Sequence, residues 1–309
     1  MKREVLMFRF VPTMKCNFRC EYCFVDNEIK KNGKTMFDKH SVDEWVKAMN
    51  NYSMYDIELY FWGGEPFCVN GTYEILREWT KLENIISGIR IDTNLYFADK
   101  IAQLCPSNKI KLNCSYHMQY HSFEEEFRKV KKLKDLEMIG MVNFVASPYN
   151  LKRLKQEYQM TPKDLINKYG EIDVFVNIAG DFTYANNKTY ERYDEYKDFI
   201  LQFVNPEDWK WLRGVDEERL CTAGRKMFTI NDDGDFTSCI SNKIYGNFFD
   251  GTLKVEEKDK ICNKNCPSIV AYPFRCDNEF QSTNSLLEYI RRNQEYRKNT
   301  INEYIEFQF

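Results

Sequence analysis

The sequence lacks the features that mark membrane-spanning, secreted and nucleic-acid-binding proteins. No apolar run approaches the roughly 18 residues that a transmembrane helix requires. The N-terminal stretch MKREVLMFRFVPTMKC is interrupted by Arg9, and no small-residue cleavage site follows it, so we predict a strand there and not a signal peptide. A formal net charge of −3 argues against a nucleic-acid-binding surface. We therefore expect a cytoplasmic protein with neither a membrane nor a nucleic acid as its partner.

Cysteine, in contrast, is abundant, at 11 of 309 residues. Thiols stay reduced in the cytoplasm, so this number of cysteines points to metal or redox chemistry and not to structural disulfides. The length allows one large domain of barrel type or two smaller ones, with enough residues for a core.

Short apolar runs alternate with amphipathic helical segments over about the first 200 residues. The predicted strands are 5–11, 57–62, 88–93, 110–115, 141–147 and 172–178. Capping boxes at 41–44 and 122–125 begin two of the intervening helices, and Gly140 is expected to end the second. Six alternations predict an α/β fold of parallel strands with right-handed crossovers, too few for a closed eight-fold barrel. Such folds bind ligands at the carboxyl ends of their strands.

The composition and periodicity of the sequence change after about residue 213, where cysteines reappear and the helical pattern weakens. We therefore predict a barrel domain over 1–212 and a smaller cysteine-containing domain over 213–280. A charged helix is expected in the remainder, 281–309.

Two short motifs follow the first two predicted strands. The stretch CNFRCEYC carries Cys16, Cys20 and Cys23, whereas closed zinc sites and ferredoxin clusters take a fourth ligand, so three thiols indicate a metal centre with one open position. The stretch GGEP, 63–66, offers two glycines that permit close approach of the backbone to a ligand, and Glu65 as an acceptor for an ammonium group. Taken singly, these motifs also fit a zinc site and a simple turn.

Together the two motifs resemble the radical S-adenosylmethionine (radical SAM) superfamily, with Tyr22 in the aromatic position before the last cysteine. The resemblance implies a partial (β/α)6 TIM-like barrel and a [4Fe–4S] cluster held by the three cysteines. It also implies that SAM binds through its methionyl amine at Gly63, Gly64, Glu65 and Pro66. Weaker matches after later strands add the candidate cofactor-binding residues Asn94, Ser115 and Asn150, and Leu95 stands where the family often has glycine.

The chemistry that the resemblance implies belongs to the cofactors. A reduced cluster gives one electron to SAM, and the resulting 5′-deoxyadenosyl radical removes a hydrogen atom from the substrate. A flavodoxin- or ferredoxin-type reductant is the implied partner. His117 and His121 follow the fourth predicted strand, where they are expected to bind substrate or relay a proton, with ordinary loop histidines as the equal alternative.

A second set of cysteines lies in the C-terminal third. Asp233 and Gly234 form a strong hairpin signal between MFTI and DFTS. The arrangement resembles the twitch or SPASM extension of radical SAM enzymes, which holds auxiliary [4Fe–4S] clusters. The region has fewer cysteines than a full SPASM extension, which favours the shorter twitch form with one cluster. The favoured ligands are Cys221, Cys239, Cys262 and Cys266, with Cys276 able to replace one of the last two, and a zinc knuckle is the alternative.

The remaining cysteines, Cys68, Cys105 and Cys114, are expected to be small buried hydrophobic residues. For the function, we expect net oxidation of a small polar or sugar-like molecule with help from the auxiliary cluster. Because the first predicted strand starts near the third or fourth residue, we expect no leader-binding domain before the barrel, which would favour a small substrate over a peptide. Maturation of a ribosomally synthesised peptide is the first alternative, and a glycyl-radical activase or a non-catalytic metal-binding module are distant ones.

Overall fold

The structure, a computed structural model, describes residues 3–20, 23, 25–85, 89–146, 148–180, 219–238 and 243–262. Its main element is an eight-stranded sheet of order β6-β5-β4-β3-β2-β1-β8-β9. The strands are β1 (Val5–Phe10), β2 (Asp56–Phe61), β3 (Ile89–Thr93), β4 (Ile110–Tyr116), β5 (Ile139–Ala146), β6 (Val176–Gly180), β8 (Met227–Ile230) and β9 (Phe236–Thr237). All neighbouring pairs from β6 to β8 are parallel, and β9 runs antiparallel to β8. The predicted fold class, a mainly parallel α/β sheet with crossover helices, is confirmed.

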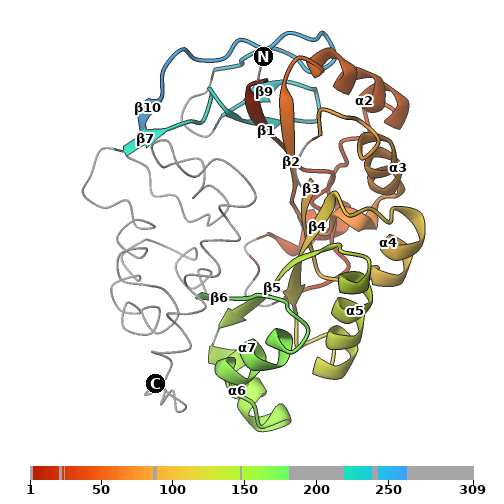
Figure 1. Cartoon of the computed structure of the whole chain (residues 1–309), viewed down its shortest axis with the longest axis vertical. Helices are drawn as coiled ribbons and strands as arrows, with labels where there is room; N and C mark the ends of the chain where they lie inside the picture. Colours follow the sequence, from red (N-terminus) through yellow and green to blue (C-terminus); the bar gives the residue numbers. More distant parts are fainter. Residues whose placement is uncertain are drawn as a thin grey trace.

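Helices connect the strands and cover one side of the sheet, as α2 to α5 show in Figure 1. The helices are α1 (Asn27–Asn32), α2 (Val42–Met49), α3 (Asn70–Trp79), α4 (Ala98–Leu104), α5 (Phe123–Asp135), α6 (Pro148–Tyr158) and α7 (Pro162–Gly170). Two short 3-10 turns, η1 (Asn50–Tyr52) and η2 (Pro66–Cys68), precede β2 and α3. Among the described residues, no helix has the length and apolar character needed to cross a membrane.

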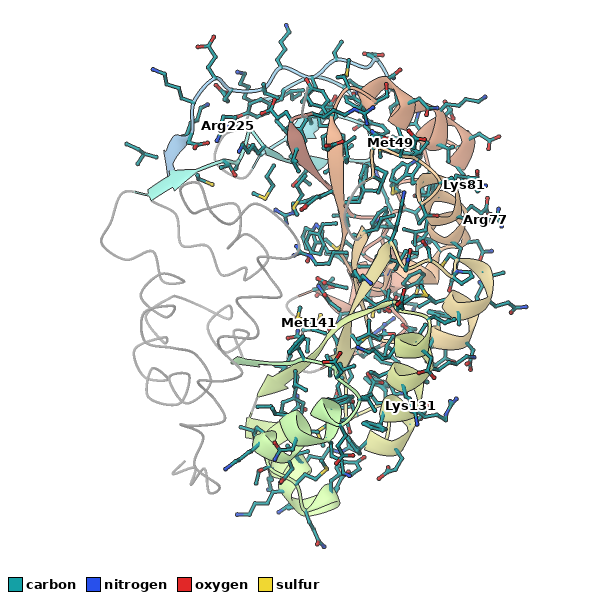
Figure 2. The ribbon with its side chains drawn as sticks, in the orientation of Figure 1. Met49, Arg77, Lys81, Lys131, Met141 and Arg225 are labelled. Atoms are coloured by element: carbon teal, nitrogen blue, oxygen red, sulfur yellow. The ribbon has the colours of Figure 1, made fainter. Side chains whose placement is uncertain are left out.

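Side-chain alternation along the strands separates the two faces of the sheet. In β1, Leu6, Phe8 and Phe10 are fully buried in the core between sheet and helices, so Met7 and Arg9 lie on the opposite face. On the helix side, Phe10 packs against Trp45 of α2 and Trp79 of α3, with ring centroids 5.9 and 5.2 Å away. Figure 2 shows Arg77, Lys81 and Lys131 pointing outward from the helical layer, whereas Met141 projects from the other face of the sheet.

Local signals account for most helix starts. Ser41 and Glu44 form the predicted capping box of α2, while Ser122 caps α5 by accepting from the backbone N–H of Glu125. The expectation for Gly140 is wrong. Helix α5 ends at Asp135, Glu137 takes the left-handed turn conformation with φ 56°, and Gly140 already lies inside β5.

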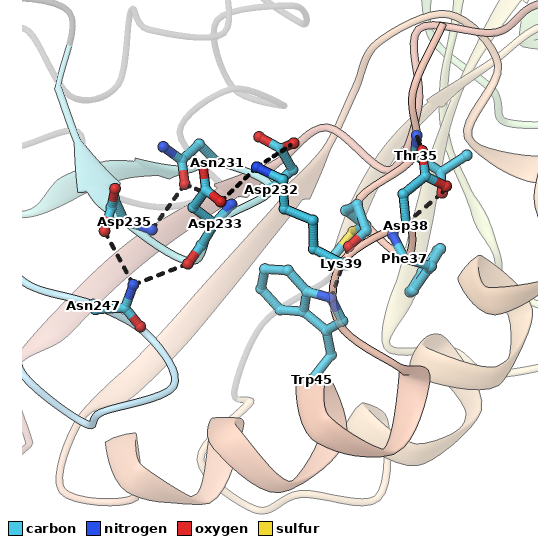
Figure 3. Close-up of polar contacts among 11 residues, drawn as sticks. Thr35, Phe37, Asp38, Lys39, Trp45, Asn231, Asp232, Asp233, Asp235 and Asn247 are labelled. Carbon is cyan, nitrogen blue, oxygen red and sulfur yellow. Dashed lines mark hydrogen bonds and ion pairs between the residues drawn. The ribbon is translucent and has the colours of Figure 1, made fainter.

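The Asp233-Gly234 hairpin is confirmed: β8 and β9 pair antiparallel, and Gly234 has φ 84°. Because β8 also pairs in parallel with β1, the hairpin extends the main sheet. In Figure 3, the side-chain amide of Asn247 donates to Asp233 and Asp235, and Lys39, from the loop before α2, forms ion pairs with Asp232 and Asp233. These contacts attach the hairpin turn to the N-terminal half of the chain.

A separate two-stranded sheet pairs β7 (Arg219–Cys221) with β10 (Lys260–Cys262) in antiparallel orientation. The predicted domain boundaries at 212 and 280, and the predicted final helix, lie outside the described residues.

Candidate metal and cofactor site

The glycine pair of the GGEP loop packs against the chain that leads into the cysteine loop. The backbone N–H of Gly64 donates to the carbonyl of Thr13 at 3.0 Å. Gly63 has φ +137°, which favours glycine, and a Cβ placed on Gly64 would lie 2.2 Å from the carbonyl oxygen of Lys15. The close approach that glycine permits is therefore made to the backbone just before Cys16, and it fixes the two loops to each other.

Glu65 ties the same loop to the end of β3. Its carboxylate is fully buried and accepts hydrogen bonds from the backbone N–H groups of Phe67 (3.1 Å) and Asn94 (2.7 Å) and from Oγ1 of Thr93 (3.0 Å). Burial raises the pKa of Glu65 to about 7, and these three donors oppose that rise. A carboxylate has about four acceptor positions, so protein donors already occupy most of them.

Asn94 reaches from the end of β3 to the cysteine loop. Its amide Nδ2 donates to Oδ1 of Asn17 at 2.8 Å and lies 3.8 Å from Sγ of Cys16. The next residue, Leu95, adopts the left-handed conformation with φ 55°, as a glycine would, while its side chain is fully buried in the core. Burial of the leucine side chain compensates the backbone strain at this position.

The three cysteines occupy one loop between β1 and α1. All three are free thiols, and the backbone N–H of Phe18 lies 3.4 Å from Sγ of Cys16. Burial raises the pKa of the Cys16 thiol above its usual value. Among the described residues, no three side chains of His, Cys, Asp or Glu are arranged to hold a single metal ion. Three reduced thiols in one loop, with N–H donors beside the first, are the donor set that a cluster with three cysteine ligands would use.

Phe18 anchors this loop, and sequence reasoning missed it. Its ring stacks on Tyr120 with centroids 3.9 Å apart and meets the ring of His117 edge-on at 5.7 Å. The hydroxyl of Tyr120 also accepts from the backbone N–H of Arg19 at 2.6 Å. The available signal was an aromatic residue between two cysteines, with a second aromatic group after the fourth strand.

The two candidate histidines have different neighbours. Nδ1 of His117 lies 3.4 Å from Sγ of Cys20, and burial lowers the pKa of His117 to about 3, so its imidazole is neutral at neutral pH. Nδ1 of His121 lies 3.3 Å from Oε1 of Glu125 and 3.2 Å from Nζ of Lys129, both on α5, and burial lowers its pKa as well. Only His117 therefore has a described polar contact with a cysteine of the loop.

The remaining candidates are spread over the same edge of the sheet. Ser115 lies inside β4, opposite Asn143 of β5, and is half-buried. Asn150 is buried in the first turn of α6, where its amide donates to the carbonyl of Val145 at 2.8 Å. Pro66 begins η2. Tyr22 lies outside the described residues.

Two of the five cysteines in the second set lie on paired strands. Cys221, which is buried, ends β7 opposite Lys260, and Cys262 ends β10 opposite Arg219. The others, Cys239, Cys266 and Cys276, lie outside the described residues.

The three cysteines expected in the core divide into two kinds. Cys105 and Cys114 are buried as predicted. The prediction is wrong for Cys68, which is half-buried with its Sγ 3.9 Å from Oδ1 of Asn17. Cys68 therefore borders the cysteine loop and is not a core residue.

Comparison with known proteins adds to this geometry. Residues 10–139 match the family model of the Radical SAM superfamily. The GTP 3′,8-cyclase of Clostridium perfringens is 24% identical over 140 residues, which are 44% of this chain and 41% of that protein. A probable GTP 3′,8-cyclase of Methanococcus maripaludis is 32% identical over 102 residues, 33% of this chain and 32% of its own length. The chain thus spans less than half the length of these curated relatives.

Solved structures resemble the chain over more of its length. Streptococcus suis SuiB bound to its precursor peptide SuiA superimposes with a TM-score of 0.51 at 16% identity, over 80% of this chain and 63% of SuiB. SuiB bound to S-adenosylmethionine gives a TM-score of 0.50 at 18% identity, over 80% of this chain and 62% of SuiB. At this identity the likeness shows the fold. The match to the Radical SAM superfamily model covers residues 10–139, which is less than half of the chain.

Proposed function

We propose that the chain is a radical SAM enzyme that reductively cleaves S-adenosylmethionine and abstracts a hydrogen atom from a polar substrate. The observation that carries this proposal is the junction of the two motif loops, where the backbone of Gly64 bonds to Thr13 shortly before Cys16. A [4Fe–4S] cluster bound by Cys16, Cys20 and Cys23 would supply the single electron that splits SAM into methionine and a 5′-deoxyadenosyl radical.

The chain's own residues would bind and orient the reactants. Glu65 holds the GGEP loop against the end of β3 through three hydrogen bonds. Since those donors use most of its acceptor positions, we assign the methionyl amine of SAM to the remaining lone pair of Glu65 and to the backbone carbonyls of Gly63 and Gly64. Asn94, directed at Cys16 and Asn17, would border the cluster on the β3 side.

For the substrate, we favour a small polar or sugar-like molecule that undergoes net oxidation. The support is the charge and hydrogen-bonding capacity of the sheet face opposite the helices, which carries Arg9, Glu58, Arg90 and Asp92 on its first three strands. Polar groups at such positions fix the orientation of a ligand with several hydroxyl, amine or acidic groups. An auxiliary [4Fe–4S] cluster that includes Cys221 and Cys262 would accept the electron left on the substrate.

Peptide maturation is the second candidate. It is supported by the likeness of this fold to SuiB, which was solved with its precursor peptide SuiA. A peptide and a small molecule would undergo the same hydrogen abstraction. They would differ only in the groups that contact the face of the sheet opposite the helices, the inner face.

The test is anaerobic reconstitution of the full chain with iron and sulfide, followed by reduction with dithionite in the presence of SAM. We expect 5′-deoxyadenosine and methionine, and a raised KM for SAM in Glu65→Ala because the loop loses three hydrogen bonds. Deuterium transfer into 5′-deoxyadenosine from labelled saccharides or from labelled peptides identifies the substrate class. Absence of 5′-deoxyadenosine from a protein with a full complement of iron would refute the proposal.

A further inference from the structure

A buried arginine lies on the face of the sheet opposite the helices. In β3, Ile89 and Ile91 are fully buried in the helix-side core, so the intervening Arg90 points to the other face. In register beside it are Tyr60 of β2 and, one strand further, Arg9 of β1. These side chains form a cross-strand row in the interior of the partial barrel.

Arg90 is 1% exposed, yet Nε and both terminal nitrogens of its guanidinium have no hydrogen-bond partner among the described residues. Its described close contact is with an aromatic ring, because the guanidinium carbon lies 4.1 Å from the centroid of Tyr60. Arg9 approaches the same ring at 5.7 Å and also has a buried Nε without a hydrogen-bond partner.

The acidic neighbour in the same strand does not satisfy Arg90. Oδ1 of Asp92 accepts from the amide of Asn113 at 2.8 Å, and Oδ2 accepts from the hydroxyl of Tyr60. Both carboxylate oxygens therefore bond to other donors, and no nitrogen of the Arg90 guanidinium forms a hydrogen bond with either of them. Glu58 is buried on β2, and its negative charge acts on Arg90.

A guanidinium in this position is costly for a folded protein. Its contact with the Tyr60 ring offsets part of the buried charge but leaves the five N–H donors without acceptors. Native structures leave few buried polar groups unpaired, and each one calls for an explanation such as a missing ligand. Burial lowers the pKa of Arg90, but a guanidinium remains protonated in proteins.

We propose that Arg90 is a substrate-binding residue that receives an anionic group, a carboxylate or a phosphate, on the inner face of the sheet. The planar fork of a guanidinium matches both anions through two parallel hydrogen bonds. The neighbouring side chains fit this role. The ring of Tyr60 packs against the guanidinium, and its hydroxyl is held by Asp92, which in turn accepts from Asn113. Arg9 adds a second positive charge beside the same ring. That the anion belongs to the substrate rests on the proposed function, whereas the anion site itself does not.

The experiment measures anion binding by the reconstituted full chain without SAM. Thermal melting is followed during titration with sodium phosphate or sodium acetate, with sodium chloride keeping the ionic strength constant. We expect saturable stabilisation by at least one anion, and a dissociation constant about tenfold or more higher in Arg90→Met, because two charge-assisted hydrogen bonds are lost. A response to phosphate alone indicates a phosphorylated substrate, and a response to acetate alone indicates a carboxylic acid.

Two further variants make the result decisive. Arg153→Met removes a half-buried arginine that pairs with Glu157 on α6, so it matches the change in charge and should keep the full response. Arg90→Lys keeps the charge without the planar fork and should bind with intermediate affinity; it also decides the matter if Arg90→Met does not fold. The inference is overturned if neither anion raises the melting temperature of the wild-type chain. It is also overturned if the melting temperature of Arg90→Met responds to the anions as that of wild type does.

The two proposals fail separately. A chain that cleaves SAM but binds neither anion loses only the role of Arg90. A chain that binds an anion through Arg90 but never forms 5′-deoxyadenosine loses the proposed radical chemistry and keeps the anion site.

Discussion

The two faces of the sheet are built for different purposes, although they share the same strands. On the helix side, Phe10 packs among Trp45 and Trp79 in an apolar core. On the opposite face, by contrast, the ring of Tyr60 lies against the guanidinium of Arg90 and its hydroxyl donates to Asp92. Alternation along each strand lets one segment serve both regions. Stability and chemistry should therefore respond to different substitutions.

The largest effect is expected from removing the loop thiols. The triple variant of Cys16, Cys20 and Cys23 to alanine should abolish formation of 5′-deoxyadenosine and reduce iron from about eight to about four atoms per chain, by the usual cluster ligation. Cys20 is buried and the other two are half-buried, but none of the three belongs to a hydrophobic core cluster, so the apo-protein should melt near the wild-type apo-protein. Iron analysis, chromatography and melting provide the three readouts.

Cys68→Ala is the matched control, since Cys68 borders the same loop without belonging to the trio. It should retain both iron and cleavage. Continued SAM cleavage in the triple variant would contradict the assignment of the site.

The next effect concerns the second cysteine set. Changing Cys221 and Cys239 to serine should leave SAM cleavage partly intact and reduce product formation to background. The reason is that the first cluster would donate the electron to SAM, whereas the auxiliary cluster would accept the electron from the substrate in a later step. Metal binding also contributes to folding, so the melting temperature must be followed in parallel. A folded variant that cleaves SAM and forms no product supports a redox role, whereas normal product formation argues against any auxiliary cluster in turnover.

A core tryptophan tests the helix side. Trp45 is fully buried, donates to the carbonyl of Met36 at 3.0 Å, and packs on Phe10. Trp45→Ala should lower the free energy of unfolding by about 3–5 kcal/mol, measured by urea denaturation, with SAM cleavage preserved where the variant is folded. Trp62→Ala is the comparison on the opposite face, where Trp62 packs beside Arg9. It should cost less stability and impair substrate turnover more.

A buried carboxyl group interrupts the apolar packing on the helix side of the sheet. Glu126 of α5 is fully buried, and neither carboxyl oxygen has a hydrogen-bond partner among the described residues. Burial raises its pKa to about 8, above the value of 4.5 expected when the chain is unfolded. Between these values the folded state holds a proton that the unfolded state has released, so this group's contribution to stability falls as pH rises from 4.5 to 8.

Glu126→Gln removes that dependence. We expect the variant to be more stable than wild type at pH 9, by up to about 5 kcal/mol from the size of the pKa shift, and nearly equal to it at pH 4.5. Urea denaturation at the two pH values measures the difference. An equal change in stability at both values would show that ionisation of Glu126 is not the cause.

Local patterns predicted the fold well because each strand and helix carries its own signal. Strand alternation and capping residues such as Ser41 act within a few residues, and both motifs were predicted to follow strands of one parallel sheet, whose carboxyl ends lie at one edge. Helix α6 was missed because its apolar pattern is weak after Pro148. Gly140 was misplaced because the turn conformation is taken by Glu137, a residue that rarely adopts it.

The contacts that shape the site were less accessible to sequence reasoning. Phe18 meets Tyr120 across about a hundred residues of chain, and Arg90 meets Tyr60 only because β2 and β3 pair in one register. A shift of one residue would turn Arg90 to the other face. Such contacts depend on the register of the whole sheet, which no short segment encodes.

The smallest predicted effect concerns His117, which directly follows β4 and contacts the cysteine loop. Nδ1 of His117 lies 3.4 Å from Sγ of Cys20, and an N–H donor to a cluster sulfur stabilises the reduced, more negative state. His117→Phe keeps a ring against Phe18 and removes the donor, so the reduction potential of the first cluster should fall. A hydrogen bond worth about 1 kcal/mol corresponds to about 40 mV for a one-electron couple. Redox titration followed by electron paramagnetic resonance measures the shift in reduction potential.

His117→Gln is the control, and it should restore part of the potential because it supplies an amide donor. If both variants match wild type in potential while losing turnover, His117 acts on the substrate and not on the cluster.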